Sequence, residues 1–300
     1  IMSRNNEERM GSPAVGHSEP PVPETPAPGG GQTGLQFVVP VEHVPLPSRG
    51  NFYPDGHPLK GKETIEIKHM TAKEEDILTS RSLLKKGLAI DKLLQSVIRE
   101  PGVNAADLLV GDKNAVIVAT RILAYGAEYN TKVQCPNCSS KVNHEFNLHQ
   151  SIVRYPGEIP EEEMGYIREE DLPEFELTDR NTFVVELPKT KVKAELRLLN
   201  GRDEKWLAQS LDKRKKAKMV ESTTTDQMRL FIVSLNGITD KAQINGFINS
   251  MPAVDARWLR QTYTTLTPNV DLTQNFECSE CGHEGEMEVP FTADFFWPKQ

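Results

Sequence analysis

All four cysteines of the chain fall into two Cys-x-x-Cys pairs, Cys135–Cys138 and Cys278–Cys281. Two thiolate pairs, each on a tight turn, supply the four ligands of a tetrahedral structural zinc site. The four sulfur atoms can surround one ion only if the two pairs meet in space. The fold must therefore bring together two segments that 139 residues separate, and no other feature of the sequence constrains it as strongly.

The sequence around each pair supports this interpretation. Strand-like segments precede the pairs at residues 129–134 and 272–277, and alternating runs follow them. Two such knuckles can face each other in a ribbon. We therefore predict one structural Zn²⁺, with no catalytic role, held by four ligands: Cys135, Cys138, Cys278 and Cys281.

Other uses of the cysteines fit less well. A redox Cys-x-x-Cys motif opens a helix after a strand, which neither pair does. A pair of disulfides would need an oxidising compartment, whereas residues 1–34 hold no apolar segment typical of a secretory signal. His144 and His283 could also bind metal, but with four thiolates present we expect them to be exposed strand or loop residues.

Composition narrows the function classes. The chain is 37% hydrophobic and 26% charged, which is typical of a globular protein. Its net charge of −8 disfavours general attraction to nucleic acid. No apolar run approaches the ~18 residues of a membrane span. The basic run Lys213–Lys218 is predicted to be a solvated helix end, or otherwise a rim that faces an acidic partner surface.

Local patterns predict several helices. Thr71 and Glu74 match a capping box, which begins a helix that Gly87 ends. Further helices are expected from about Asp91 and from Asp112 to Tyr125, and a helical pattern runs from Asp203 to about Thr265.

Strands are expected where apolar and polar residues alternate. The predicted strands cover residues 35–40, 64–68, 182–187, 192–198 and 270–277. Pro45–Pro58 holds four prolines and should follow an extended, turning path. Its aromatic residues, Phe52 and Tyr53, either dock on another subunit or fold over their own domain.

These elements predict an α+β fold in which a helical N-terminal half and an inserted α/β segment are joined by a split zinc ribbon formed from the two knuckles. Residues 1–34, with six prolines and six glycines, are predicted to be a tail that is disordered or ordered only by a partner. The remaining divisions are residues 35–150 with the first knuckle, the insertion 151–268, and residues 269–300 with the second knuckle and a C-terminal strand.

No phosphate-binding loop, nucleophile elbow or other catalytic constellation stands out, so we predict that the protein is not an enzyme. A zinc-ribbon module that binds nucleic acid is the alternative, although basic and aromatic residues are not interleaved as such modules require.

The chain also resembles a known family. Val44–Pro54, Ile65–Thr79, Ile90–Arg99 and Arg121–Tyr129, the last leading into Cys135–Cys138, are similar to T4-like phage baseplate proteins. The resemblance is strongest over residues 35–150, and it implies that this division of the chain is a baseplate-type domain.

Members of that family belong to the central hub of contractile phage tails or to its assembly. The resemblance therefore implies a structural or assembly protein that binds other baseplate and hub subunits in several copies, without nucleic acid or a membrane span. It implies a location in the virion tail and, during assembly, in the host cytoplasm.

Overall fold

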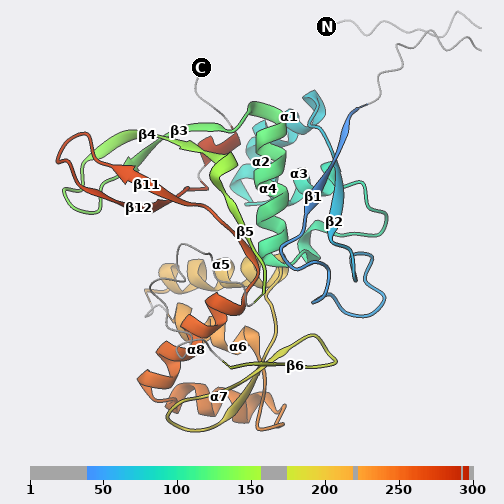
Figure 1. Ribbon diagram of the computed structural model, residues 1–300, viewed down its shortest axis with the longest axis vertical. Helices are drawn as coiled ribbons and strands as arrows, with labels where there is room; N and C mark the ends of the chain where they lie inside the picture. Colours follow the sequence, from blue (N-terminus) through green and yellow to red (C-terminus); the bar gives the residue numbers. More distant parts are fainter. Residues whose placement is uncertain (1–38, 157–173, 219–221, 292, 297–300) are drawn as a thin grey trace, which may run out of the picture. The chain divides into compact units, whose positions relative to one another are not determined.

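The computed structural model describes residues 39–156, 174–218, 222–291 and 293–296, all within one compact unit. These residues form eight α-helices, one four-stranded sheet and four two-stranded sheets, so the fold is α+β as predicted (Figure 1). The predicted tail, residues 1–34, lies outside the described residues.

The described chain begins with two antiparallel strands, β1 (Val41–Pro45) and β2 (Thr64–Lys68). Ile65 and Ile67 are buried in β2, as its alternation predicts. Residues 35–38 of the strand expected at 35–40 lie outside the described residues, and the described strand begins at Val41, with Val44 opposite Ile65.

Four helices follow, and their ends are set by local signals. The predicted single helix up to Gly87 is in fact two, α1 (Ala72–Thr79) and α2 (Arg81–Lys85), because Ser80 adopts an extended conformation between them. Helix α3 (Ala89–Val97) buries its apolar face, and α4 (Val110–Tyr125) ends at Gly126 with φ 80°.

The predicted capping box at the start of α1 is present, and its Glu74 side chain also contacts β2 and α3. The buried Glu74 carboxylate accepts hydrogen bonds from the Thr71 amide at 2.9 Å, from Lys68 at 2.7 Å and from Ser96 at 2.5 Å. Burial alone would raise the pKa of Glu74, but these hydrogen bonds outweigh it and lower the pKa to about 2.

After α4 the chain forms one long hairpin, and a second one follows much later in the sequence. Strands β3 (Glu128–Gln134) and β4 (Lys141–Asn147) form the first hairpin, and β11 (Thr273–Glu277) and β12 (Glu284–Glu288) form the second. A short ladder joins β5 (Ile152–Arg154) to β10 (Asn269–Asp271). Leu272 separates β10 from β11, so the single strand predicted over residues 270–277 is divided.

The segment between β5 and β10 contains a four-stranded antiparallel sheet with four helices. Its strands are β6 (Glu176–Leu177), β7 (Phe183–Glu186), β8 (Lys193–Leu196) and β9 (Ile232–Leu235), and its helices are α5 (Gly201–Lys216), α6 (Thr223–Phe231), α7 (Lys241–Ser250) and α8 (Ala253–Leu266).

Strand β9 corrects the helical prediction for residues 203–265. The run from Ile232 to Leu235 is too short for its period to distinguish a strand from a buried helix segment. Pairing with β8 decides the outcome, since Ile232 lies opposite Leu196 and both side chains are buried.

The proline-rich segment after β1 packs onto its own chain. The Tyr53 hydroxyl is buried and donates a hydrogen bond to Asp112 at 2.8 Å, while Ser48 donates two more to the same carboxylate. The Phe52 ring lies 5.0 Å from the Phe183 ring. Of the two possibilities left open by the sequence, the structure favours a segment folded over its own domain.

Helix α4 also contacts two segments that are distant in the sequence, at Pro268 and at Phe295. A Cβ on Gly111 would lie 2.0 Å from the Pro268 carbonyl oxygen, so only glycine permits this approach. Arg121 is fully buried and donates hydrogen bonds to the carbonyl oxygens of Phe295 at 2.6 Å, Gly126 at 2.5 Å and Glu128 at 3.0 Å. It therefore joins α4 to the start of β3 and to the 3₁₀-helix η4 (Ala293–Phe296).

Candidate metal centre

Each cysteine pair lies on the turn of one hairpin, and the two turns have the same backbone geometry. The amide of Cys135 donates to Ser140 and that of Ser139 donates back to Cys135, both at 2.9 Å. The second turn repeats this pattern, with Cys278 donating to His283 and Gly282 donating to Cys278 at the same distance. Ser139 and Gly282 also share a left-handed conformation, with φ 59° and 65°.

The two turns bring the four sulfur atoms together. The Sγ atoms of Cys135 and Cys281 lie 3.8 Å apart, as do those of Cys138 and Cys278. All four ligand atoms lie within 4.8 Å of one another. A tetrahedral zinc ion with Zn–S bonds of about 2.3 Å requires sulfur atoms about 3.8 Å apart, so these residues fit such an ion.

The pKa values of two cysteines in the cluster, Cys138 and Cys278, are shifted in opposite directions. Hydrogen bonds from Ser140 lower the pKa of Cys138 to about 6, whereas burial raises the pKa of Cys278 to about 11. The Asn137 amide donates to the Cys281 sulfur at 3.7 Å. A divalent cation would offset the cost of holding four thiolates so close together.

Neither histidine near the cluster belongs to it. Within the described part of the chain, the group of side chains able to hold a metal ion consists of the four cysteines. His144 is half-buried on β4, with its ring 4.6 Å from Phe146 and 5.2 Å from Phe276. His283 is likewise half-buried, so the expectation that both histidines are exposed is wrong, and packing against Phe146 and Phe276 covers His144.

The bases of the two hairpins are also joined, by a contact that the sequence did not indicate. Gln274 points inward from β11, and its side chain accepts from the Asn147 amide at 3.0 Å and donates to the Asn147 carbonyl at 2.9 Å. The period-two pattern of β11 could have placed Gln274 on the inner face, but not identified its partner. Arg121 was missed for the same reason, since one of its acceptors lies 174 residues away.

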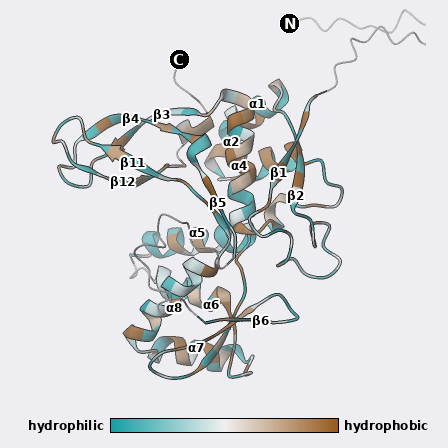
Figure 2. Ribbon diagram, in the orientation of Figure 1, coloured by the Kyte–Doolittle hydropathy of each residue, from teal (hydrophilic) through white to brown (hydrophobic). Residues whose placement is uncertain are grey.

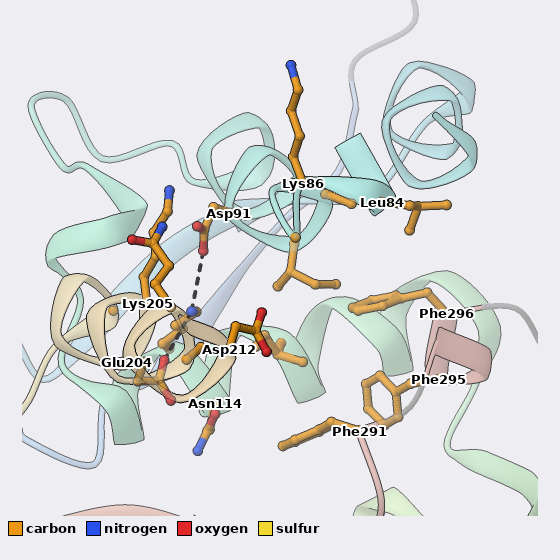
Figure 3. Close-up of a pocket in the computed structure, with 18 residues that line it drawn as sticks. Leu84, Lys86, Asp91, Asn114, Glu204, Lys205, Asp212, Phe291, Phe295 and Phe296 are labelled. Atoms are coloured by element: carbon orange, nitrogen blue, oxygen red, sulfur yellow. Dashed lines mark hydrogen bonds and ion pairs between the residues drawn. The ribbon is translucent and has the colours of Figure 1, made fainter. Parts of the chain in front are cut away.

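A separate cavity of about 830 Å³ lies beside α3, α4, α5 and η4 (Figure 3). Its aromatic wall includes Phe291, Phe295 and Phe296. On the opposite side Lys113 pairs with Asp91 at 3.3 Å and with Glu204 at 3.1 Å. Among the described residues, no histidine, cysteine or serine lines this cavity.

Comparison with known proteins gives one match. The sequence model of the family described as T4 bacteriophage base plate protein matches residues 55–297. No curated protein and no solved structure matches the chain. The described helices include none that is long and apolar enough to cross a membrane.

Proposed function

Because the chain belongs to the family of T4 bacteriophage base plate proteins, we propose that it is a structural or assembly protein of the baseplate hub in a contractile phage tail. The observation that carries this proposal is the family match, which spans residues 55–297 and so includes both cysteine pairs. The protein acts by binding other baseplate and hub subunits, in several copies, and has no enzymatic turnover. It functions in the virion tail and, during assembly, in the host cytoplasm.

A structural zinc ion supports this role. Cys135, Cys138, Cys278 and Cys281 hold Zn²⁺ as thiolates, and their sulfur spacing of 3.8 Å within each closest pair supports this assignment. Four protein ligands close the coordination shell, which leaves no position for a reactive water molecule. The ion joins the two hairpins as a split zinc ribbon and stabilises the fold.

The division of the chain follows from the same proposal. Residues 35–150 carry the first knuckle, residues 151–268 form an insertion, and residues 269–300 return to complete the ribbon. The tail, residues 1–34, would order against a neighbouring subunit.

Deletion and complementation in the phage test the proposal. Deletion should give particles without functional baseplates, and a plasmid copy should restore them. Cys278→Ser should fail to complement, whereas Ser279→Ala, an exposed change in the same turn, should succeed. Mass spectrometry of purified particles then separates a virion subunit from an assembly factor. Normal baseplates in the absence of the protein would contradict the proposal.

Metal analysis tests the zinc separately. Purified protein should contain about one equivalent of zinc, which Cys278→Ser should remove. An iron–sulfur spectrum, or two disulfides with no metal, would refute the zinc assignment. Loss of zinc binding without loss of baseplate assembly would refute only the role of the ion.

A further inference from the structure

Helix α5 has a solvent-exposed face that no other described element covers. Of its 16 residues only Gly201 is fully buried, and most of the others are hydrophilic (Figure 2). Trp206, Gln209, Lys213 and Lys216 follow one another at intervals of three or four residues, which places them on one face of the helix. All four are exposed, and the Trp206 side chain retains 48% of its accessible surface.

No described residue forms an ion pair with the two lysines on this face. In the described residues, neither Lys213 nor Lys216 forms an ion pair, whereas Arg214, which points away from this face, pairs with Asp226 at 3.3 Å. Tryptophan is enriched among the residues that carry binding energy in protein–protein contacts, so an exposed tryptophan on the same helix face as two lysines favours such a contact.

The outer face of the β11–β12 hairpin has the opposite charge. Its inner face packs against the first hairpin through Gln274 and Phe276, so the alternate positions point outward. The outward positions hold four exposed glutamates: Glu277, Glu284, Glu286 and Glu288. Glu277 lies directly opposite Glu284, and such like-charge pairs destabilise a hairpin unless a partner compensates them. No ion pair involving these four is present in the described chain.

The two faces also match in length. Trp206 and Lys216 are ten residues apart, which spans about 15 Å along a helix. Glu284 and Glu288 are four residues apart, which spans about 13 Å along a strand. The three aligned glutamates of β12 can therefore extend along most of the Trp206–Lys216 face, and Lys213 and Lys216 supply its positive charge at the C-terminal end.

We propose that the α5 face of one molecule docks on the outer face of the β11–β12 hairpin of a second copy. Both faces occur on every copy, and neither has a charge partner among the described residues of its own chain. Because the two faces differ, the contact is heterologous and links copies head to tail into a ring or chain. This inference rests on the proposed function only in requiring several copies to act together. Nucleic acid fits less well, because the hairpin glutamates would repel phosphates.

Charge reversal tests this contact in the full-length, zinc-loaded protein. Sedimentation equilibrium at low salt should show self-association that weakens at least about tenfold in half-molar salt. Lys213→Glu with Lys216→Glu should abolish it, and so should Glu284→Lys with Glu286→Lys. The chain carrying all four reversals should associate again, because its two faces remain complementary.

A matched control lies on the first hairpin. Glu128→Lys changes an exposed charge on β3 and should leave association unchanged. Circular dichroism and metal content verify that each variant is folded. A protein that stays monomeric at low salt, or self-association that survives both double reversals, would overturn the proposal. So would duplex DNA binding that the lysine reversals abolish. None of these outcomes would affect the deletion phenotype, which tests the baseplate role by itself.

Discussion

Replacing Arg121 with methionine should destabilise the protein more than any other single arginine change in the described chain. The side chain is fully buried and reaches three main-chain carbonyl oxygens, but no carboxylate. Burial lowers the pKa of Arg121, yet a guanidinium stays protonated across the working pH range, so the charge is retained. Methionine fills a similar volume and donates no hydrogen bond.

The expected loss can be worked from these contacts. A hydrogen bond from a charged donor contributes about 1.5–3 kcal/mol, so three contribute about 4.5–9 kcal/mol. Burying the guanidinium costs part of this, and each of the three carbonyl oxygens left without a donor costs about 1–3 kcal/mol, or about 3–9 kcal/mol in total. We expect a loss in that range, which is a large fraction of the ~5–15 kcal/mol that stabilises a domain.

Urea denaturation of the zinc-saturated protein measures this loss. Arg99→Met is the matched control, because Arg99 is 58% exposed and its ion pair with Glu66 is 3.9 Å long, so it should cost less than about 1 kcal/mol. Arg121→Lys should recover at most about half of the loss, since one ammonium cannot reproduce the fork that serves three carbonyl groups. A cost below about 1 kcal/mol for Arg121→Met would refute the reasoning.

Three further predictions follow from the same structure. The pKa of Glu74, about 2, lies below its ordinary value of 4.5, so Glu74 should stabilise the fold by about 3 kcal/mol above pH 4.5. This contribution should vanish as the pH falls from about 4.5 to about 2. Glu74→Gln should therefore flatten the unfolding free energy over that pH window, and an unchanged profile would contradict the assignment. Cys278→Ser or chelation should lower the melting temperature to a similar extent, whereas Ser279→Ala should leave it unchanged. Gly111→Ala should cost at least about 2 kcal/mol by denaturant titration because of its clash with backbone. Gly246→Ala, in a helix with open space, should instead stabilise the protein by up to about 1 kcal/mol.

The sequence predicted the features that local signals or ligand chemistry determine. The capping box at Thr71 and the helix end at Gly126 depend on neighbouring residues, and both lie where they were expected. The convergence of the cysteines was predictable because four thiolates must surround one ion. The knuckles of residues 135–140 and 278–283 share one backbone hydrogen-bond geometry.

The sequence did not predict features that depend on distant partners. Strand β9 forms because it pairs with β8, and a short apolar run carries no sign of that pairing. The split at Ser80 likewise was not visible in the apolar pattern of the surrounding helices. Arg121 and Gln274 looked like ordinary polar residues, and their acceptors lie elsewhere in the sequence.

The contacts at the base of the hairpins reduce the loop-closure entropy that a metal ion held by the four cysteines would have to offset. If the cysteine pairs met unaided, zinc would close a loop of 139 residues. The β5–β10 ladder, reinforced by an Arg154–Asp271 ion pair at 3.4 Å, closes most of that loop independently of the cysteines. Ile152 lies opposite Asp271, so the path from Cys138 across this ladder to Cys278 contains only about 20 residues. Compared with a loop of 139 residues, this shorter loop lowers the entropic cost of closure by about 1.7 kcal/mol.

The Gln274–Asn147 contact shortens the remaining loop again, so the protein's own contacts hold the two cysteine pairs near each other. Metal affinity of a structural site is worth about 10–16 kcal/mol, far more than this residual closure costs. Under the proposed zinc assignment, the surplus would fix the hairpin tips rigidly against each other. This rigidity matters most for the outer face of β11 and β12, because a surface that docks on another subunit binds more tightly when it is ordered beforehand.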